Sequence, residues 1–507
     1  MLFLKCVLSH SVTRCKNKIK KRKIVSLSQN YCEKVINKYL TSQIKLNFPF
    51  APTIQQEKTI EMLADFLLEP KERQVFMLCG YAGTGKTTLI SALVRTLLQI
   101  ERRVVLLAPT GRAAKVFSNY SGTGAHTIHK CIYRQKSIVN DSVFTLSENR
   151  SRNTLFIVDE ASMIANAGLS GFGSGALLDD LIEYVYSGDG CSLLLLGDTA
   201  QLPPVGEELS PALSCEYLRS MFLSVERVEM TQVMRQSDGS GILYNATHLR
   251  RIIAEGVTGV APEIRFTGFA DVCRVSGDEL IEAIETCYSE AGIDETIILC
   301  RSNKRANIYN EGIRRRILYR EDELNRGDYL MVVKNNYYWH EELGKQDASL
   351  LEKIDFVANG DIARIERVGS VEEMYGFRYA EVTLSFVDYD DCEMDVTILL
   401  DTLKSEAPSL TREQSERLFQ AVWDDYPEIR SKRKRIEQMR KNPYYNALQV
   451  KYGYAVTCHK AQGGQWRRVF IDQGFIAADG YGPDYYRWLY TAFTRAAERL
   501  YLVNWKE

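Results

Sequence analysis

Residues Gly80 to Thr87 combine glycines, a lysine and a threonine at a spacing that suits phosphate binding. Their sequence, GYAGTGKT, fits the pattern G-x-x-x-x-G-K-[ST] of the phosphate-binding P-loop. In such a loop the glycines let backbone N–H groups approach the phosphates, the lysine pairs with the β- and γ-phosphates, and the threonine hydroxyl binds Mg²⁺. We therefore expect a nucleotide with β- and γ-phosphates, together with Mg²⁺, at this loop. The expected nucleotide contacts in this stretch are Gly80, Gly83, Thr84, Gly85, Lys86, Thr87 and Thr88.

Two adjacent carboxylates, Asp159 and Glu160, directly follow the apolar run 155–158. In a P-loop NTPase a carboxylate at such a strand end holds Mg²⁺, and its neighbour acts as general base toward water. The sequence therefore predicts that Asp159 shares the metal with Thr87 and that Glu160 is the base. Taken alone, an Asp-Glu pair is usually a solvated turn, but the P-loop upstream favours the functional interpretation.

One glutamine and two arginines complete the expected catalytic set. Gln201 lies in the polar loop 197–206 and could orient the attacking water or sense the γ-phosphate, although a rigid proline-containing turn is an equally good interpretation. Arg235 and Arg495 are candidates for stabilising the charge of the transition state. Each would by default be a surface arginine. Arg495 lies far along the chain, so a second domain must bring it to the nucleotide.

Apolar runs that end in these polar loops alternate with segments of helical periodicity. A strand before the P-loop and a helix after it give that motif its required context. Strands that alternate with helices are typical of a parallel α/β sheet whose site lies at the carboxyl ends of the strands. The expected strands of a first block are 75–79, 103–107, 155–158 and 193–196, and those of a second block are 297–300, 454–457 and 500–503.

A different pattern interrupts the second block. Short β runs fill residues 327–400 and predict a small inserted barrel, and charged helices follow it. The fold class is therefore α/β with a β insertion. The expected organisation is an N-terminal extension at 1–47, partly disordered, a first domain at 48–235, a second domain at 236–326 and 451–507, a β insertion at 327–401 and a charged helical extension at 402–450.

Composition narrows the class of protein further. The 507 residues carry a formal net charge of −1, so a nucleic-acid partner must be bound by a local groove and not by a global positive field. No apolar run reaches the length of a membrane span, so no membrane partner is expected. The 12 cysteines form no C-x-x-C pair, which argues against zinc and favours reduced thiols in a cytoplasmic protein. The basic cluster 16–23 fits a disordered tail, a nucleic-acid-binding arm or an extension from a misassigned start.

Segments spread over residues 48–505 resemble, in order, the motifs of superfamily 1 DNA helicases of the RecD/Dda-like branch, superfamily 1B. Matches that arrive in the family's own order are far more specific than any one motif. Besides the P-loop, the matching segments are 53–56 (TIQQ, the Q motif), 108–115 (APTGRAAK, motif Ia), 125–129 (AHTIH, motif Ib), 158–163 (VDEASM, motif II), 197–206 (motif III), 229–236 (motif IV), 454–463 (motif V) and 490–496 (motif VI).

This resemblance implies two RecA-like domains with ATP between them, single-stranded DNA across their tops, and 5′→3′ translocation. It places Gln56 at the adenine. Packing within the protein is the alternative for the two histidines among the DNA-facing positions. Those positions, where polar or small groups suit contacts with phosphate and sugar, are Pro109, Thr110, His129, Thr457, His459 and Lys460.

Two insertions resemble the unwinding devices of the family. Residues 131–150 fit a hairpin that turns near Asn140 and Asp141, and in the family such a hairpin, the pin, splits the duplex. Phe144 is the candidate wedge, and a place in a small core is the equal alternative. The 327–401 insertion resembles the family's SH3-like domain, and the 402–450 helices could rest on the pin.

The resemblance thus predicts an ATP-dependent DNA helicase, monomeric or weakly associating. It would act on single-stranded DNA and on single-strand/duplex junctions, in DNA repair, recombination or replication. Two alternatives stay open. A translocase or remodeller of protein–DNA complexes would lack a functional pin, and a nucleotide-dependent binding or switch module would need no full hydrolysis set. The preference for DNA over RNA rests on the resemblance alone, and the sequence identifies no protein partner.

Overall fold

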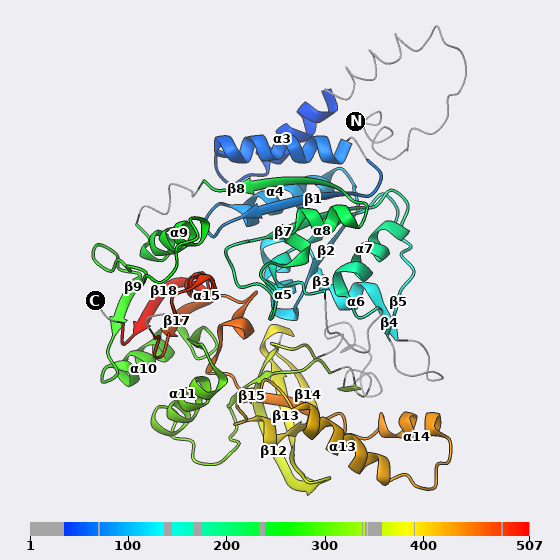
Figure 1. Ribbon diagram of the computed structural model, residues 1–507, viewed down its shortest axis with the longest axis vertical. Helices are drawn as coiled ribbons and strands as arrows, with labels where there is room; N and C mark the ends of the chain where they lie inside the picture. Colours follow the sequence, from blue (N-terminus) through cyan, green and yellow to red (C-terminus); the bar gives the residue numbers. More distant parts are fainter. Residues whose placement is uncertain are drawn as a thin grey trace.

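The computed structural model describes residues 35–68, 71–135, 144–166, 174–232, 239–336, 338–339, 342, 357–389, 391–477 and 480–505. Two parallel sheets flanked by helices, and a small barrel, make up this part of the chain (Figure 1). The expected α/β class with two domains is confirmed. None of the described helices has both the length and the apolar character needed to cross a membrane.

The first sheet is wholly parallel and has the order β3-β2-β6-β7-β1-β8. Strands β1, β6 and β7 are buried along their whole length, as expected for central strands that are covered on both faces. The strands of this sheet are β1 (Gln74–Gly80), β2 (Val104–Ala108), β3 (Ala125–Thr127), β6 (Leu155–Val158), β7 (Ser192–Gly197) and β8 (Ser224–Met230).

Helices cover both faces of the first sheet and bury separate apolar clusters. The helical residues 35–46 contribute Leu40 and Ile44 to one of these clusters, so this part of the N-terminal extension packs on the first domain. Residues 1–34 lie outside the described residues. The helices on this face are α3 (Ile54–Leu68), α4 (Lys86–Gln99) and α5 (Gly111–Ser121), and those on the other are α6 (Ile128–Ile132), α7 (Leu177–Ser187) and α8 (Cys215–Ser220).

The second sheet is also parallel and has the order β16-β10-β17-β18-β9. Its strands are β9 (Val272–Val275), β10 (Thr296–Cys300), β16 (Ala455–Thr457), β17 (Trp466–Asp472) and β18 (Ala496–Val503). One face packs on α9 (Gly241–Ala254) and α15 (Pro483–Phe493), and the other on α10 (Leu280–Ala291) and α11 (Asn303–Arg316). Short 3₁₀ turns are η1 (Ala161–Met163), η2 (Pro211–Leu213), η5 (Val387–Tyr389), η6 (Leu400–Thr402) and η7 (Cys458–Ala461).

A closed five-stranded barrel is built onto the second domain. It consists of β11 (Tyr329–Val332), β12 (Ile362–Met374), β13 (Phe377–Phe386), β14 (Cys392–Leu399) and β15 (Leu448–Tyr452). Strand β15 corrects one expectation, because residues 448–452 fall partly in the segment expected to be a helical extension. Two strongly charged helices, α13 (Arg412–Asp424) and α14 (Lys432–Met439), lie between β14 and β15. The run LQVKY is too short to be recognised as a strand directly after them.

A short two-stranded sheet lies at the side of the first domain (Figure 1). Strand β4 (Tyr133–Gln135) pairs antiparallel with β5 (Phe144–Leu146), and Gln135 stands opposite Phe144. The expected turn at Asn140 and Asp141 lies outside the described residues, as does the side chain of Phe144. The strand pairing is the part of the expected hairpin that the structure describes.

Candidate nucleotide and DNA site

The P-loop has the backbone that phosphate binding requires. Gly83 and Gly85 adopt φ angles of 78° and 81°, a region that suits glycine. Helix α4 starts directly after them, so its N-terminal N–H groups and its dipole face the loop. The ammonium of Lys86 donates hydrogen bonds to the carbonyl groups of Gly80 and Tyr81, which holds the cation over the loop.

Gln56 ties the start of α3 to the P-loop. The side chain is 1% exposed. Its amide oxygen accepts from the Thr53 N–H at 2.9 Å, and its amide nitrogen donates to the Thr84 carbonyl at 3.1 Å. The structure therefore places Gln56 beside the nucleotide loop, and its contact with adenine stays a prediction.

Three carboxylates converge beside Lys86: Asp159 and Glu160 after β6, and Asp198 after β7. Burial raises the pKa of all three, and that of Glu160 reaches about 6 although the attraction of Arg495 lowers it. Glu160 also has a φ of 52°, an uncommon conformation for a non-glycine residue and one often found at functional sites. A carboxylate with a pKa near neutrality suits a general base.

No three of these acidic side chains are arranged to hold a metal ion by themselves in the described part of the chain, but the Asp159 carboxylate and the Thr87 hydroxyl suit a divalent cation bound together with phosphate. The first domain supplies Lys86 as a cation for the three carboxylates, and burial penalises their negative charge. Carboxylate and hydroxyl oxygens are the ligands that Mg²⁺ prefers. Asp159 and Thr87 would hold the ion, which would neutralise phosphate charge. The Tyr120 hydroxyl donates to Asp159 and orients its carboxylate.

Arg495 reaches this cluster from the second domain. It follows α15 and is 3% exposed. Its guanidinium donates to the Gly464 carbonyl at 3.1 Å and to the Thr491 carbonyl at 3.2 Å, and its charge acts on both Glu160 and Asp198. The structure thus brings Arg495 to the predicted base. The other candidate arginine, Arg235, lies outside the described residues.

The second domain forms hydrogen bonds with the backbone of the loop that carries Gln201. The Gln201 amide oxygen is buried and accepts no hydrogen bond from the described part of the chain. Helix α15 holds the backbone around it, because Arg487 donates to the Thr199 carbonyl and the Thr491 hydroxyl accepts from the Leu202 N–H at 2.8 Å. Both sides of the domain seam therefore meet at this loop.

Tyr490 is a residue that we did not single out from the sequence. Its hydroxyl accepts from the Ala82 N–H of the P-loop at 3.0 Å and donates to an Asp198 carboxylate oxygen at 2.6 Å. One side chain of the second domain thereby contacts two nucleotide-site segments of the first. Its place in the motif VI segment, five residues before Arg495, is the only signal in the sequence.

The predicted DNA-facing residues of motifs Ia and V lie close together. A side chain on Gly463 would approach the Ala113 side chain to 2.9 Å, so the two motifs are in contact. Thr110 accepts from the Ala113 N–H at 3.2 Å and caps α5, with Pro109 partly exposed beside it. Thr457 ends β16, His459 is exposed, and the Lys460 ammonium donates to Asn359 of the barrel.

His129 stands apart from these positions. It lies on α6, is buried, and its ring centroid is 5.8 Å from that of Tyr133. Burial lowers the pKa of His129 to about 4, so the imidazole is neutral at physiological pH. This arrangement matches the packing alternative more closely, and a DNA contact by His129 stays a prediction.

The barrel lies directly against motif Ia. Lys115 of α5 donates to the Val387 carbonyl at 2.9 Å, and a side chain on Gly111 would come within 2.3 Å of the Tyr389 hydroxyl. The sequence offered no signal for these contacts, because they depend on how an inserted barrel is placed. They put the barrel beside two of the predicted DNA-facing segments.

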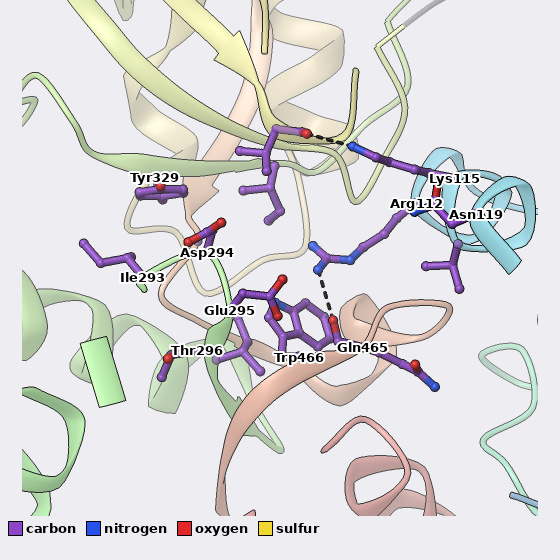
Figure 2. A pocket seen from close by; sticks show the side chains of 15 residues that line it. Arg112, Lys115, Asn119, Ile293, Asp294, Glu295, Thr296, Tyr329, Gln465 and Trp466 are labelled. Carbon is purple, nitrogen blue, oxygen red and sulfur yellow. Dashed lines mark hydrogen bonds between the residues drawn. The ribbon is translucent and has the colours of Figure 1, made fainter. Parts of the chain in front are cut away.

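A pocket of about 220 Å³ lies where the two domains and the barrel meet (Figure 2). The Arg112 guanidinium lies 4.1 Å from the Trp466 ring centroid and donates to the Gln465 carbonyl at 3.4 Å. Asp294 and Glu295 line the side nearer the second domain. The arginine therefore links α5 to the start of β17 across the seam.

A P-loop on one parallel sheet and an arginine supplied by a second sheet together define a two-domain P-loop nucleotide hydrolase. Residues 55–257 match the family described as AAA domain, and residues 452–503 match the UvrD-like helicase C-terminal domain. The first match covers the first domain and continues through α9, which packs on the second sheet, and the second match falls within the second domain.

Curated relatives include two helicases. The chain is 22% identical over 423 residues to the ATP-dependent DNA helicase dda of Enterobacteria phage T4, covering 77% of this chain and 86% of that protein. It is 30% identical over 174 residues to the ATP-dependent RecD2 DNA helicase of Deinococcus radiodurans, covering 34% of this chain but only 21% of that protein. It is also 24% identical to the uncharacterized protein R530 of Acanthamoeba polyphaga mimivirus, covering 88% of this chain and 98% of that protein.

A Bacteroides Pif1 helicase, solved with ADP-AlF3 and single-stranded DNA, resembles the chain with 16% identity and a TM-score of 0.44, covering 90% of this chain and 93% of that one. On the family matches and the named relatives, the chain belongs to the superfamily 1B helicases of the RecD/Dda-like family. It is an ATP-dependent DNA helicase.

Proposed function

We propose that this helicase moves 5′→3′ along single-stranded DNA and separates duplex at single-strand/duplex junctions, with Mg²⁺ and ATP as cofactors. It acts as a monomer in the cytoplasm, in DNA repair, recombination or replication. The domain at 48–235 carries the nucleotide site, and the domain at 236–326 and 451–507 closes on it.

The observation that carries this proposal is the position of Arg495 against Glu160. Hydrolysis needs a base near the water and positive charge on the transferred phosphoryl group. Here the base comes from the first domain and the positive charge from the second. Completion of the site therefore requires the domains to close, which links each hydrolysis cycle to a movement. A binding or switch module would need no such arrangement.

The DNA part of the proposal follows from motifs Ia and V. Thr110, Thr457 and Lys460 would contact the backbone of the strand, with Pro109 and His459 beside them. Lys460 has a pKa of about 8, lowered chiefly by burial, so a phosphate beside it would also favour its charged form. Contacts of this kind bind without sequence preference and weaken steeply with salt.

Strand separation is assigned to the hairpin of β4 and β5, and the barrel is assigned the role of the family's SH3-like domain. A two-stranded hairpin is marginal by itself, so it needs a brace. The barrel with α13 and α14 lies on the same side of the molecule as the hairpin in Figure 1 and supplies the candidate brace. Phe144 remains the candidate wedge, since an aromatic ring can stack on a base for about 1–3 kcal/mol.

A strand-displacement assay on four substrates tests the direction and the nucleic acid. Duplexes of DNA and of RNA, each with either a 5′ or a 3′ tail, are mixed with the protein and Mg²⁺-ATP. The 5′-tailed DNA duplex alone should be separated. Separation of the 3′-tailed duplex would overturn the direction. ATP hydrolysis at an equal rate with and without DNA would instead favour the switch module.

The hairpin is tested by shortening the segment that joins β4 to β5, and separately by Phe144→Ala. Duplex separation should fall sharply in both variants, while DNA-stimulated ATP hydrolysis and movement along single strands survive. Streptavidin displacement from an unpaired strand measures that movement. A shortened variant that separates duplex at the normal rate would exclude this hairpin as the pin. If the unmodified protein moves along single strands but does not separate duplex DNA, the translocase alternative is favoured.

A further inference from the structure

Tyr490 occupies a position that the hydrolysis mechanism does not by itself require. The ring is fully buried, and the hydroxyl bridges the Ala82 N–H and the Asp198 carboxylate, at 3.0 and 2.6 Å. Both partners belong to the first domain, whereas Tyr490 belongs to α15 of the second. The phenol is thus a direct polar link from the second domain into the P-loop.

The Ala82 N–H directly precedes the expected phosphate contacts 83–88, and we infer that it lies within reach of a bound phosphate. In these loops the backbone N–H groups cradle the phosphate oxygens. One N–H can make one strong hydrogen bond, so a phosphate oxygen and the Tyr490 hydroxyl compete for it. We propose that Tyr490 is a positioning residue that reports phosphate binding in the P-loop to the second domain, through exchange of this one hydrogen bond.

Asp198 gives the exchange a second stable arrangement. When a phosphate takes the Ala82 N–H, the Tyr490 hydroxyl keeps its hydrogen bond to the Asp198 carboxylate, so no buried hydroxyl is stranded. Burial raises the pKa of Tyr490 well above that of a free tyrosine, so the phenol stays protonated and remains a donor. The link therefore has two satisfied states, which a switch requires.

Helix α15 converts the exchange into a movement of catalytic groups. Tyr490 shares the helix with Arg487 and Thr491, which hold the backbone of the Gln201 loop. The helix ends at Phe493, and Arg495 follows two residues later. A small shift of the Tyr490 ring thus moves Arg495 and the Gln201 loop together. Since the same helix belongs to the body that carries motif V, nucleotide binding and DNA binding become coupled through it.

The inference rests on nucleotide binding at the P-loop, and it is independent of the direction of movement and of the pin. Tyr490→Phe removes the hydroxyl and keeps the ring. Tyr486→Phe is a matched control, because Tyr486 lies on the same helix, is equally buried and donates to the Val260 carbonyl at 2.7 Å, away from the P-loop. Melting curves of both variants show whether either change affects folding.

The affinity for a fluorescent non-hydrolysable ATP analogue is measured with and without saturating oligo(dT). In the unmodified protein and in Tyr486→Phe, the DNA changes this affinity by one common factor, the coupling factor. In Tyr490→Phe the analogue should bind more tightly without DNA, because the competitor for the Ala82 N–H is gone. Its coupling factor should shrink about tenfold, the effect of one buried hydrogen bond. An unchanged coupling factor in Tyr490→Phe overturns the inference.

A second measurement avoids any risk of misfolding. 3-Fluorotyrosine is placed at position 490, or at 486 as the control, and the ¹⁹F signal is followed as the analogue is added. The signal at 490 should shift as the phosphate site fills, and that at 486 should not. No shift at 490 with full analogue binding overturns the inference. Failure of the unmodified protein to bind the analogue would instead contradict the nucleotide site itself.

Discussion

The second domain packs against two neighbours, and the two seams differ in how much apolar surface and how many hydrogen bonds they contain. Toward the barrel, one continuous apolar cluster runs from Ile298 of the sheet to Leu330 of the barrel, and buried Asp328 is paired with Arg314 at 2.9 Å. Toward the first domain at the nucleotide site, the apolar contact is small: Ala200 and Leu202 pack on the second-domain core, and hydrogen bonds from α15 to loop backbone, such as that of Thr491 at 2.8 Å, supply the rest.

This difference indicates which seam stays closed and which one opens during the hydrolysis cycle. Opening the barrel seam would expose apolar surface at roughly 25 cal/mol for each Å² and strand a buried carboxylate. Opening the nucleotide seam exposes a smaller apolar surface around Ala200 and Leu202, and it replaces hydrogen bonds that contribute about 0.5–1.5 kcal/mol each with hydrogen bonds to water. We therefore expect the barrel and the second domain to move as one body against the first domain.

The largest expected effect belongs to the nucleotide seam. Arg495→Ala should lower kcat for ATP by about 10³-fold, because it removes the charge that stabilises the transition state. The melting temperature should change little. Arg467→Ala, an exposed arginine of the same domain, is the control and should leave kcat unchanged. A loss of melting temperature with unchanged kcat per folded molecule would place Arg495 in a structural role.

The barrel seam should give the reverse pattern. Arg314→Leu leaves Asp328 with Arg320 as its one remaining arginine partner within the part of the chain that the structure describes, and should lower the free energy of unfolding by about 3 kcal/mol. The kcat per folded molecule should stay near normal, because the nucleotide seam is intact. Arg315→Leu, at an exposed neighbouring position on α11, should have almost no effect on urea unfolding. Equal destabilisation by both changes would contradict the comparison.

A smaller effect concerns pH. Glu160 has a pKa of about 6, raised by burial, and only its ionised form can accept a proton from water. The rate of ATP hydrolysis at saturating DNA should therefore level off above about pH 7 and fall about tenfold per pH unit well below 6. The residual activity of Glu160→Gln should lack this step. A step that persists in Glu160→Gln would belong to another group.

The positions of the nucleotide residues were predictable because they are local. The P-loop glycines, the strand before them and the helix after them are neighbours in sequence, and parallel strands deliver Glu160 and the loop that carries Gln201 to the same sheet edge. Arg495 could be expected at the same place only through a resemblance that spans both domains. The contact between motifs Ia and V is likewise a property of two domains, and Gly463 alone does not reveal it.

Other features depend on packing that the sequence does not state. The Tyr490 hydroxyl contacts the P-loop because α15 packs against that loop. Apart from its place in the motif VI segment, nothing in the sequence distinguishes this tyrosine from the other tyrosines among the 28 in the chain. Strand β15, which closes the barrel, is five residues long and follows two charged helices. The charged composition of this region therefore predicted a helical extension and did not indicate a strand. The sequence around Gly111 is not that of a turn, so it does not explain why a glycine is found there. The structure explains it, because a side chain at this position would collide with the Tyr389 hydroxyl.

The contacts of the barrel with Lys115 and Lys460 have a topological consequence. On the proposed path the DNA strand lies beside motifs Ia and V, and the barrel meets both from outside through Val387 and Asn359. A linear strand can be threaded under such a bridge by its end, but a circle has no end to thread. The Lys460–Asn359 contact lies within the body formed by the second domain and the barrel, so we expect circular single-stranded DNA to enter from the side once the Lys115–Val387 hydrogen bond has opened. We therefore expect the opening rate of this one contact to limit how fast the enzyme binds a gap in a closed circular DNA.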